Sequence, residues 1–149
     1  MELSDSLPAD NCLCLGIEFG RYLREKSRLS LRVTAGDIPP PEGGSKGFDL
    51  IVGWEATVGE DSASRLEMIY RALNEEGEAR LFGFYLQPSR NDIHLWEDKC
   101  RKRGERGELP LPLPGSVSMG AIAALLKSTP FERYTVRKKG IYYEAVLQK

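Results

Sequence analysis

The chain has 149 residues, of which 41% are hydrophobic and 29% charged, with a formal net charge of −1. This length and composition indicate one globular domain over residues 1–149. The near-neutral charge gives no reason to expect nucleic acid as a partner, and no apolar run is long enough to span a bilayer. The first ten residues are polar and acidic, so we expect no signal peptide and a cytoplasmic location.

The first expected strand, residues 12–15, runs into a glycine-containing turn, Gly16-Ile17-Glu18-Phe19-Gly20, that opens a helix expected over residues 20–28. Such a turn between strand and helix lets backbone N–H groups and a helix N-terminus approach a ligand closely. The usual three-glycine version has glycine at the middle position as well, where this chain has Glu18. The turn therefore predicts a nucleotide-binding loop with one departure.

Two further strands precede the middle of the chain. Residues 29–34 alternate apolar and polar side chains, and a proline- and glycine-rich loop follows at residues 39–45. Residues 48–53 form a nearly continuous apolar run, which suits a strand buried on both faces of a parallel sheet.

A helix and a strand follow in the pattern of a βαβ unit. Asp61-Ser62 predicts the N-cap, Gly77 predicts the C-terminal end, and residues 79–86 predict the next strand. The helix itself is predicted by apolar residues at helical spacing, Leu66, Ile69, Tyr70 and Leu73. This order predicts that the strands before and after the helix are parallel neighbours.

The last third predicts two helices and a hairpin. A charged helix is expected over residues 91–104, and a proline-rich loop over residues 109–115 is expected to lie across the sheet or over a cleft. Ser118 predicts the N-cap of the second helix. Strands at 131–137 and 141–147, with a turn at 138–140, then predict an antiparallel end to a mostly parallel α/β sheet.

The cysteines and basic residues favour ordinary structural roles. Cys12 and Cys14 share one side of an expected strand, and the single histidine, His94, does not complete a standard zinc set with them and Cys100. We therefore expect buried free thiols and no metal site. The basic cluster at 99–103 is flanked by acidic residues, which predicts a solvated helix end rather than a nucleic-acid contact.

Four segments of this chain resemble motifs of class I S-adenosylmethionine-dependent methyltransferases. Residues 13–20 are similar to their first motif, residues 36–39 to the segment that meets the adenine, residues 48–52 to the central strand, and residues 73–77 to the turn before the fifth strand. The resemblance implies a Rossmann-like methyltransferase sheet, S-adenosylmethionine as cofactor, and a small molecule or a protein as methyl acceptor. Ligands of such sheets bind outside the carboxyl ends of the strands. The cofactor-binding residues that it implies are Gly16, Glu18, Gly20, Asp37, Ile38, Trp54 and Glu55.

The chain also departs from the family pattern. Between Gly20 and Phe48 there is room for about one helix, one strand and a loop, so one βα unit is expected to be missing near the N-terminus. If the second strand is missing, the acidic residue that holds the ribose is missing with it. If residues 29–34 are the second strand, Asp37 takes that role and the adenine side is incomplete. Glu18 either accepts a hydrogen bond from the ammonium group of the cofactor or blocks the approach of the ligand.

The sequence leaves the activity open. No motif for a particular methyl acceptor follows the central strand, so the catalytic residues are unknown. Trp54 is either an adenine-stacking or a core residue, and His94 is either a base near the cleft or a surface histidine. Three functions remain: a methyltransferase, a catalytically inactive methyltransferase-like domain that binds a protein partner, or another doubly wound nucleotide-binding protein, since a Gly-x-x-x-Gly turn alone does not identify the ligand.

Overall fold

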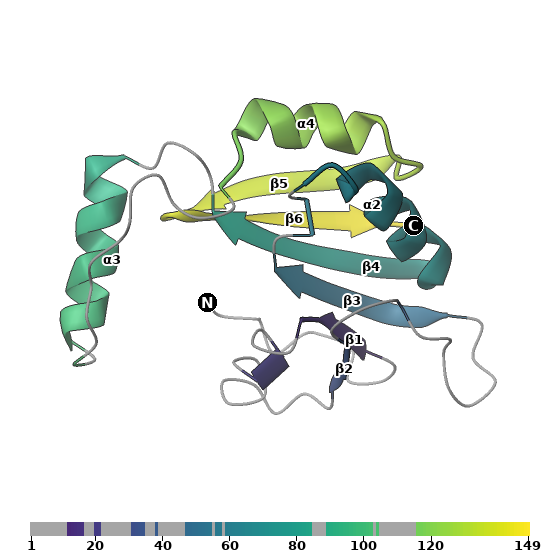
Figure 1. Cartoon of the computed structure of the whole chain (residues 1–149), viewed down its shortest axis with the longest axis horizontal. Coiled ribbons are helices and arrows are strands. Elements are labelled where there is room, and N and C mark those ends of the chain that lie inside the picture. Colours follow the sequence, from purple (N-terminus) through teal and green to yellow (C-terminus); the bar gives the residue numbers. More distant parts are fainter. Residues whose placement is uncertain are drawn as a thin grey trace.

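A computed structural model describes residues 12–16, 20–21, 31–34, 38, 47–54, 56–57, 59–84, 89–102, 104 and 116–149. Within these ranges the chain forms one six-stranded sheet with three helices (Figure 1). In chain order the elements are β1 (Cys12–Leu15), β2 (Leu31–Thr34), β3 (Phe48–Trp54), α2 (Ser62–Ala72), β4 (Leu73–Phe84), α3 (Arg90–Lys102), α4 (Met119–Lys127), β5 (Arg133–Lys139) and β6 (Tyr142–Gln148).

The strand order is β2-β1-β3-β4-β6-β5. The first four of these strands are parallel, whereas β6 runs antiparallel to both β4 and β5. This topology confirms the predicted α/β sheet that is mostly parallel and ends in an antiparallel hairpin. A short turn after β5 reverses the direction of the chain, and β6 then lies between β4 and β5.

Two buried clusters lie on opposite faces of the sheet. On one face α2 and α4 contribute Leu66, Ile69, Ile122 and Leu126 to the main core, and Figure 1 shows both helices on the same side of the strands. The strands supply the rest of that core, including Leu13, Ile51, Ala79, Leu81, Tyr143, Ala145 and Leu147. The other face carries a smaller cluster of Cys12, Cys14, Leu50, Val52 and Phe82.

All three cysteines are free and buried, which confirms the prediction of buried thiols. Cys12 and Cys14 belong to the smaller cluster, and Cys100 lies on α3. Across the described ranges, no three His, Cys, Asp or Glu side chains come together as a metal-ligand group. None of the helices in those ranges has the length and apolar character needed to cross a membrane.

The predicted end of α2 at Gly77 is wrong. The helix ends at Ala72 because Leu73 is already extended, with φ −79° and ψ 143°, and is buried as the first residue of β4. Gly77 lies inside β4, where a Cβ atom would be 2.8 Å from the Asn74 carbonyl oxygen and 3.0 Å from the Phe48 carbonyl oxygen. The glycine therefore permits a close approach of two strands at a point where the β3–β4 register shifts.

Other predicted boundaries need smaller corrections. The strand expected at 29–34 is observed over its described part, Leu31–Thr34, and residues 29–30 lie outside the described residues. The hairpin turn falls at Gly140 and Ile141 rather than at 138–140, because Lys139 already pairs with Tyr142 and Gly140 supplies the positive φ of 62°. Of the helix expected at 20–28, Gly20 and Arg21 are helical; its remainder and the loop at 109–115 lie outside the described residues.

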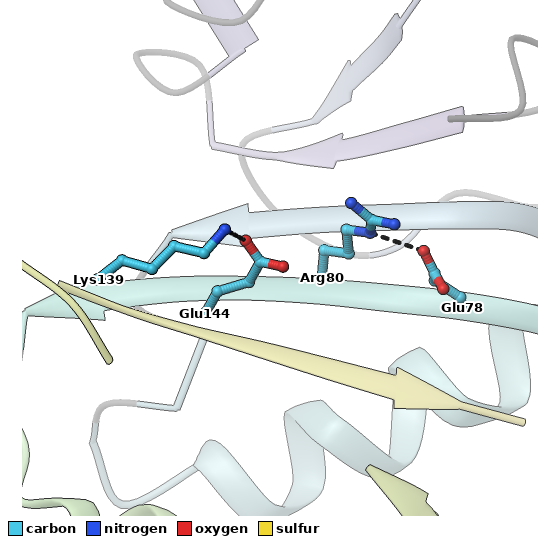
Figure 2. A network of polar contacts seen from close by, with 4 residues as sticks. All are labelled: Glu78, Arg80, Lys139 and Glu144. Atoms are coloured by element: carbon cyan, nitrogen blue, oxygen red, sulfur yellow. Dashed lines mark hydrogen bonds and ion pairs between the residues drawn. The ribbon is translucent and has the colours of Figure 1, made fainter. Parts of the chain in front are cut away.

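Two ion pairs join four charged residues on one side of the sheet (Figure 2). Arg80 Nε lies 2.6 Å from Glu78 Oε1, and Lys139 Nζ lies 2.6 Å from Glu144 Oε2. Arg80 and Phe82 are two positions apart in β4, so their side chains point to the same face of the sheet. Glu144 of β6 pairs with Phe82 and lies on that face as well. These charges are therefore on the face opposite α2 and α4, and each has its counter-charge within the pair.

Candidate functional site

The carboxyl ends of the parallel strands meet at one edge of the sheet. Leu15 at the end of β1 pairs with Thr34 at the end of β2 on one side and with Gly53 near the end of β3 on the other. After β1 the chain continues into β2 on one side of it and then into β3 on the opposite side, so the strand order reverses here. A crevice at such a point is where open α/β sheets bind ligands.

Gly16 begins the glycine turn immediately after β1. Its φ is +106°, a conformation that favours glycine. Its N–H donates to the Thr34 carbonyl oxygen at 2.7 Å, and its own carbonyl oxygen accepts from the Gly20 N–H at 2.9 Å. The two hydrogen bonds tie the turn both to the end of β2 and to the start of the following helix.

Gly20 packs against β2. A Cβ atom at Gly20 would lie 2.6 Å from Cγ2 of Val33 and 2.8 Å from Cγ1 of Val33. Glycine at this position therefore allows the first turn of the helix to approach the sheet closely. The two glycines that the sequence singles out thus have different physical roles, one in the backbone conformation of the turn and one in helix–strand packing.

Comparisons with known proteins bear on this arrangement. No protein-family model matches the sequence, and a search of curated proteins finds no match. Solved structures do match. An S-adenosylmethionine-dependent methyltransferase of Thermotoga maritima, described as a possible histamine N-methyltransferase, aligns with a TM-score of 0.60 and 14% identity, over 97% of this chain and 84% of its own.

Two more structures extend the likeness. The plantazolicin methyltransferase BpumL, in complex with a monoazolic desmethylPZN analogue and S-adenosylhomocysteine, aligns with a TM-score of 0.54 and 13% identity, over 93% of this chain and 75% of its own. Human N-acetylserotonin methyltransferase in complex with S-adenosylmethionine aligns with a TM-score of 0.53 and 14% identity, over 93% of this chain and 47% of its own. The chain has the fold of a class I S-adenosylmethionine-dependent methyltransferase. It spans most of the Thermotoga protein and less than half of the human enzyme.

Within this methyltransferase fold, the structure places Leu31–Thr34 directly beside β1. Of the two alternatives that the sequence left open, this position supports the one in which residues 29–34 supply the second strand. In the described part of the chain, β2 is the outermost strand on its side of the sheet. Within the described residues no strand occupies the position beyond β2, and which βα unit is missing stays a prediction.

Trp54 ends β3 and lies half-buried in an aromatic group. Its ring meets Phe84 edge-to-face with centroids 5.0 Å apart, and the Tyr142 ring lies at 6.4 Å. It packs against the smaller cluster, on the face opposite α2 and α4. The ring thus contributes to the core, and the cofactor-binding role of Trp54 stays a prediction.

The remaining predicted site residues fall into two groups. Ile38 is half-buried and packs against the main core, whereas Glu18, Asp37 and Glu55 lie outside the described residues, so their roles stay predictions. His94 is 79% exposed on α3, with Nδ1 3.9 Å from Glu97 Oε2. This exposure favours the surface-histidine interpretation over a base in a cleft.

Sequence reasoning missed a buried polar pair next to this edge. The hydroxyl groups of Thr57 and Tyr143 are hydrogen-bonded to each other, and both residues are buried. One signal was available, because an isolated glycine inside a strand often marks the close approach of another group. Gly83 in β4 is such a glycine, and Tyr143 is its partner in β6.

Proposed function

We propose that this chain binds S-adenosylmethionine at the carboxyl edge of β1 and β3 and transfers its methyl group to a small molecule or a protein. The observation that carries the proposal is the Gly16 turn. It is held in a positive-φ conformation at the point where the strand order reverses, and it is hydrogen-bonded to the end of β2. A turn of this kind exposes backbone N–H groups and a helix N-terminus to a ligand.

The cofactor, when bound, supplies the reactive methyl group, so the chain has to bind and orient it. Asp37 follows β2, and because β2 lies directly beside β1 we assign to Asp37 the hydroxyls of the ribose. We assign to Glu18 a hydrogen bond from the ammonium group of the cofactor. Methyl transfer from a sulfonium depends mainly on alignment of donor and acceptor, so a dedicated base is required only for an acceptor that must lose a proton.

A second candidate function is a catalytically inactive domain that binds a protein partner. The short outer strand favours it: β2 has four residues, and in the described part of the chain no strand lies beyond it. For an inactive domain we expect the adenine side of the cofactor pocket to be incomplete. An inactive domain would keep the fold without the affinity for the cofactor.

Calorimetric titration with S-adenosylmethionine and S-adenosylhomocysteine separates the two functions. We expect micromolar binding by the wild-type chain and loss of binding in Gly16→Arg, because the added side chain would occupy the space over the turn. Gly140→Arg is the matched control: Gly140 also has a positive φ, of 62°, but it lies in the β5–β6 hairpin, and a Cβ atom added there would have nothing within 4 Å.

The control should bind both ligands as the wild type does. Absence of measurable heat with either ligand at millimolar concentration would reject cofactor binding and favour the protein-binding domain. Equal loss in both variants would show that the effect of Gly16→Arg comes from backbone strain rather than from the site.

A further inference from the structure

Tyr143 and Thr57 form a polar contact inside an otherwise apolar core. Tyr143 is fully buried in β6, Thr57 is 5% exposed, and 86 residues separate them along the chain. Their hydroxyl groups are hydrogen-bonded on the face of the sheet that α2 and α4 cover. A buried hydroxyl that lost its partner would destabilise the fold, so the pairing fixes where Thr57 lies.

Gly83 makes this contact possible. It lies opposite Tyr143 in the β4–β6 ladder, and a Cβ atom there would be 2.7 Å from the Tyr143 hydroxyl oxygen and 3.0 Å from its Cε1 and Cζ atoms. The phenol ring therefore lies across β4 in the space that any other residue at position 83 would fill. Because the ring crosses β4, its hydroxyl reaches Thr57, in the short described segment after β3 that consists of residues 56–57.

That segment is anchored a second time from α2 and bordered by an aromatic contact. Arg65 Nη1 donates to the Ala56 carbonyl oxygen at 3.0 Å. On the opposite face of the sheet, the Tyr142 ring lies 6.4 Å from the Trp54 ring. Two consecutive tyrosines of β6 thus contact the end of β3 and the residues after it from opposite faces.

We propose that Tyr143 is a positioning residue for the cofactor site: through Thr57 it holds residues 56–57, which follow β3, in their binding conformation before a ligand arrives. This inference rests on the proposed function, because the segment lies at the edge assigned to S-adenosylmethionine. Loops at such an edge are otherwise mobile, and ordering them on binding lowers affinity. Tyr143 and Thr57 act through the conformation of this segment and need not touch the ligand.

The test measures the Kd of S-adenosylhomocysteine by calorimetry in four single variants and one double variant, together with amide hydrogen exchange at Ala56 and Thr57 without ligand. Tyr143→Phe and Thr57→Val remove one hydroxyl each and keep the shape of the side chain. Thr57→Ser keeps the hydroxyl. Tyr134→Phe is the matched control, since Tyr134 packs against the same core from β5.

We expect Tyr143→Phe and Thr57→Val each to raise the Kd about five- to tenfold and to speed exchange at Ala56 and Thr57. The double variant should lose no more than either single variant, because both remove the same hydrogen bond. Thr57→Ser and Tyr134→Phe should stay within about twofold of the wild type.

Three results would overturn the proposal. An unchanged Kd in Tyr143→Phe, or an equal loss in Tyr134→Phe, would show that the hydroxyl does not position the site even though the wild type binds. Failure of the wild type to bind would reject the proposed function and the positioning role together. Faster exchange in Tyr143→Phe would in that case identify the contact as purely structural.

Discussion

The two halves of the strand order, β2 and β1 at one end and β4, β6 and β5 at the other, differ in strand length and in the features that they contain. On one side β4 has 12 residues and β5 and β6 have seven each, whereas β1 and β2 on the other side have four each. The long strands supply much of the main core, and α2 and α4 pack on it. The short strands carry the Gly16 turn and its hydrogen bond to β2. The fold therefore separates the part that holds most of the buried apolar surface from the part that presents the candidate site.

This separation has a thermodynamic consequence. Stability is not uniform across a protein, and ligand-binding segments are drawn from its less stable parts. Substitutions in β4 and β6 should then lower the free energy of unfolding strongly, whereas comparable substitutions near β1 and β2 should lower it less and change ligand binding more. Matched pairs of substitutions across the sheet test this difference.

The largest expected difference in the free energy of unfolding is between Leu81→Ala and Leu15→Ala. Both side chains flank Gly53, where a Cβ atom would lie 3.5 Å from each of them. Leu81 is fully buried and Leu15 is half-buried. We expect Leu81→Ala to lower the free energy of unfolding by about 3 kcal/mol and Leu15→Ala by about 1 kcal/mol, measured by urea denaturation. Equal losses would show that the two sides of the sheet contribute alike.

A smaller difference in the free energy of unfolding is expected between Gly83→Ala and Gly20→Ala. The added methyl group would meet the buried Tyr143 ring at position 83 and the side chain of Val33, in the outer strand β2, at position 20. The Tyr143 ring is enclosed and hydrogen-bonded, so we expect a loss of about 2 kcal/mol for Gly83→Ala. For Gly20→Ala we expect about 1 kcal/mol or less, because an outer strand can shift.

Gly120→Ala is the control for this pair. Gly120 lies on α4 with nothing within 4 Å of an added Cβ atom, so the exchange should raise stability by up to about 1 kcal/mol through helix propensity alone. Thermal and urea unfolding of the three variants give the comparison. A loss for Gly20→Ala as large as that for Gly83→Ala would mean that β2 is held as rigidly as β4.

The strands were predictable from sequence because burial on both faces leaves continuous apolar runs, as in Phe48–Trp54. The end of α2 was not, because the helical spacing of Leu66, Ile69 and Leu73 continues into the strand. Leu73 is instead extended and buried at the start of β4, where it pairs with Phe48 of β3. Local pattern alone cannot supply that non-local pairing.

For the candidate site, the sequence and the structure can be compared only at the glycine turn, and the cofactor-binding roles stay predictions. Gly16 and Gly20 stand out in the sequence because a strand and a helix start flank them; Gly16 has the positive φ of the turn, and Gly20 allows the close packing against Val33. The Thr57–Tyr143 contact has no local signature, since the two residues meet only after β6 inserts beside β4. The available signal was indirect: Gly83, an isolated glycine in β4, indicates that another group approaches the strand closely there, and that group is the Tyr143 ring.

The smallest expected difference concerns the two helices that cover the main core. Ser118 caps α4 by accepting a hydrogen bond from the Ala121 N–H at 3.0 Å, whereas Asp61 makes no such bond to α2. We expect Ser118→Ala to lower the free energy of unfolding by about 1 kcal/mol and Asp61→Ala to leave it nearly unchanged, as measured by urea denaturation. The start of α2 would then depend on its tertiary anchor, the Arg65–Ala56 hydrogen bond, rather than on a local cap. A loss for Asp61→Ala equal to that for Ser118→Ala would instead show that the Asp61 side chain stabilises the start of α2.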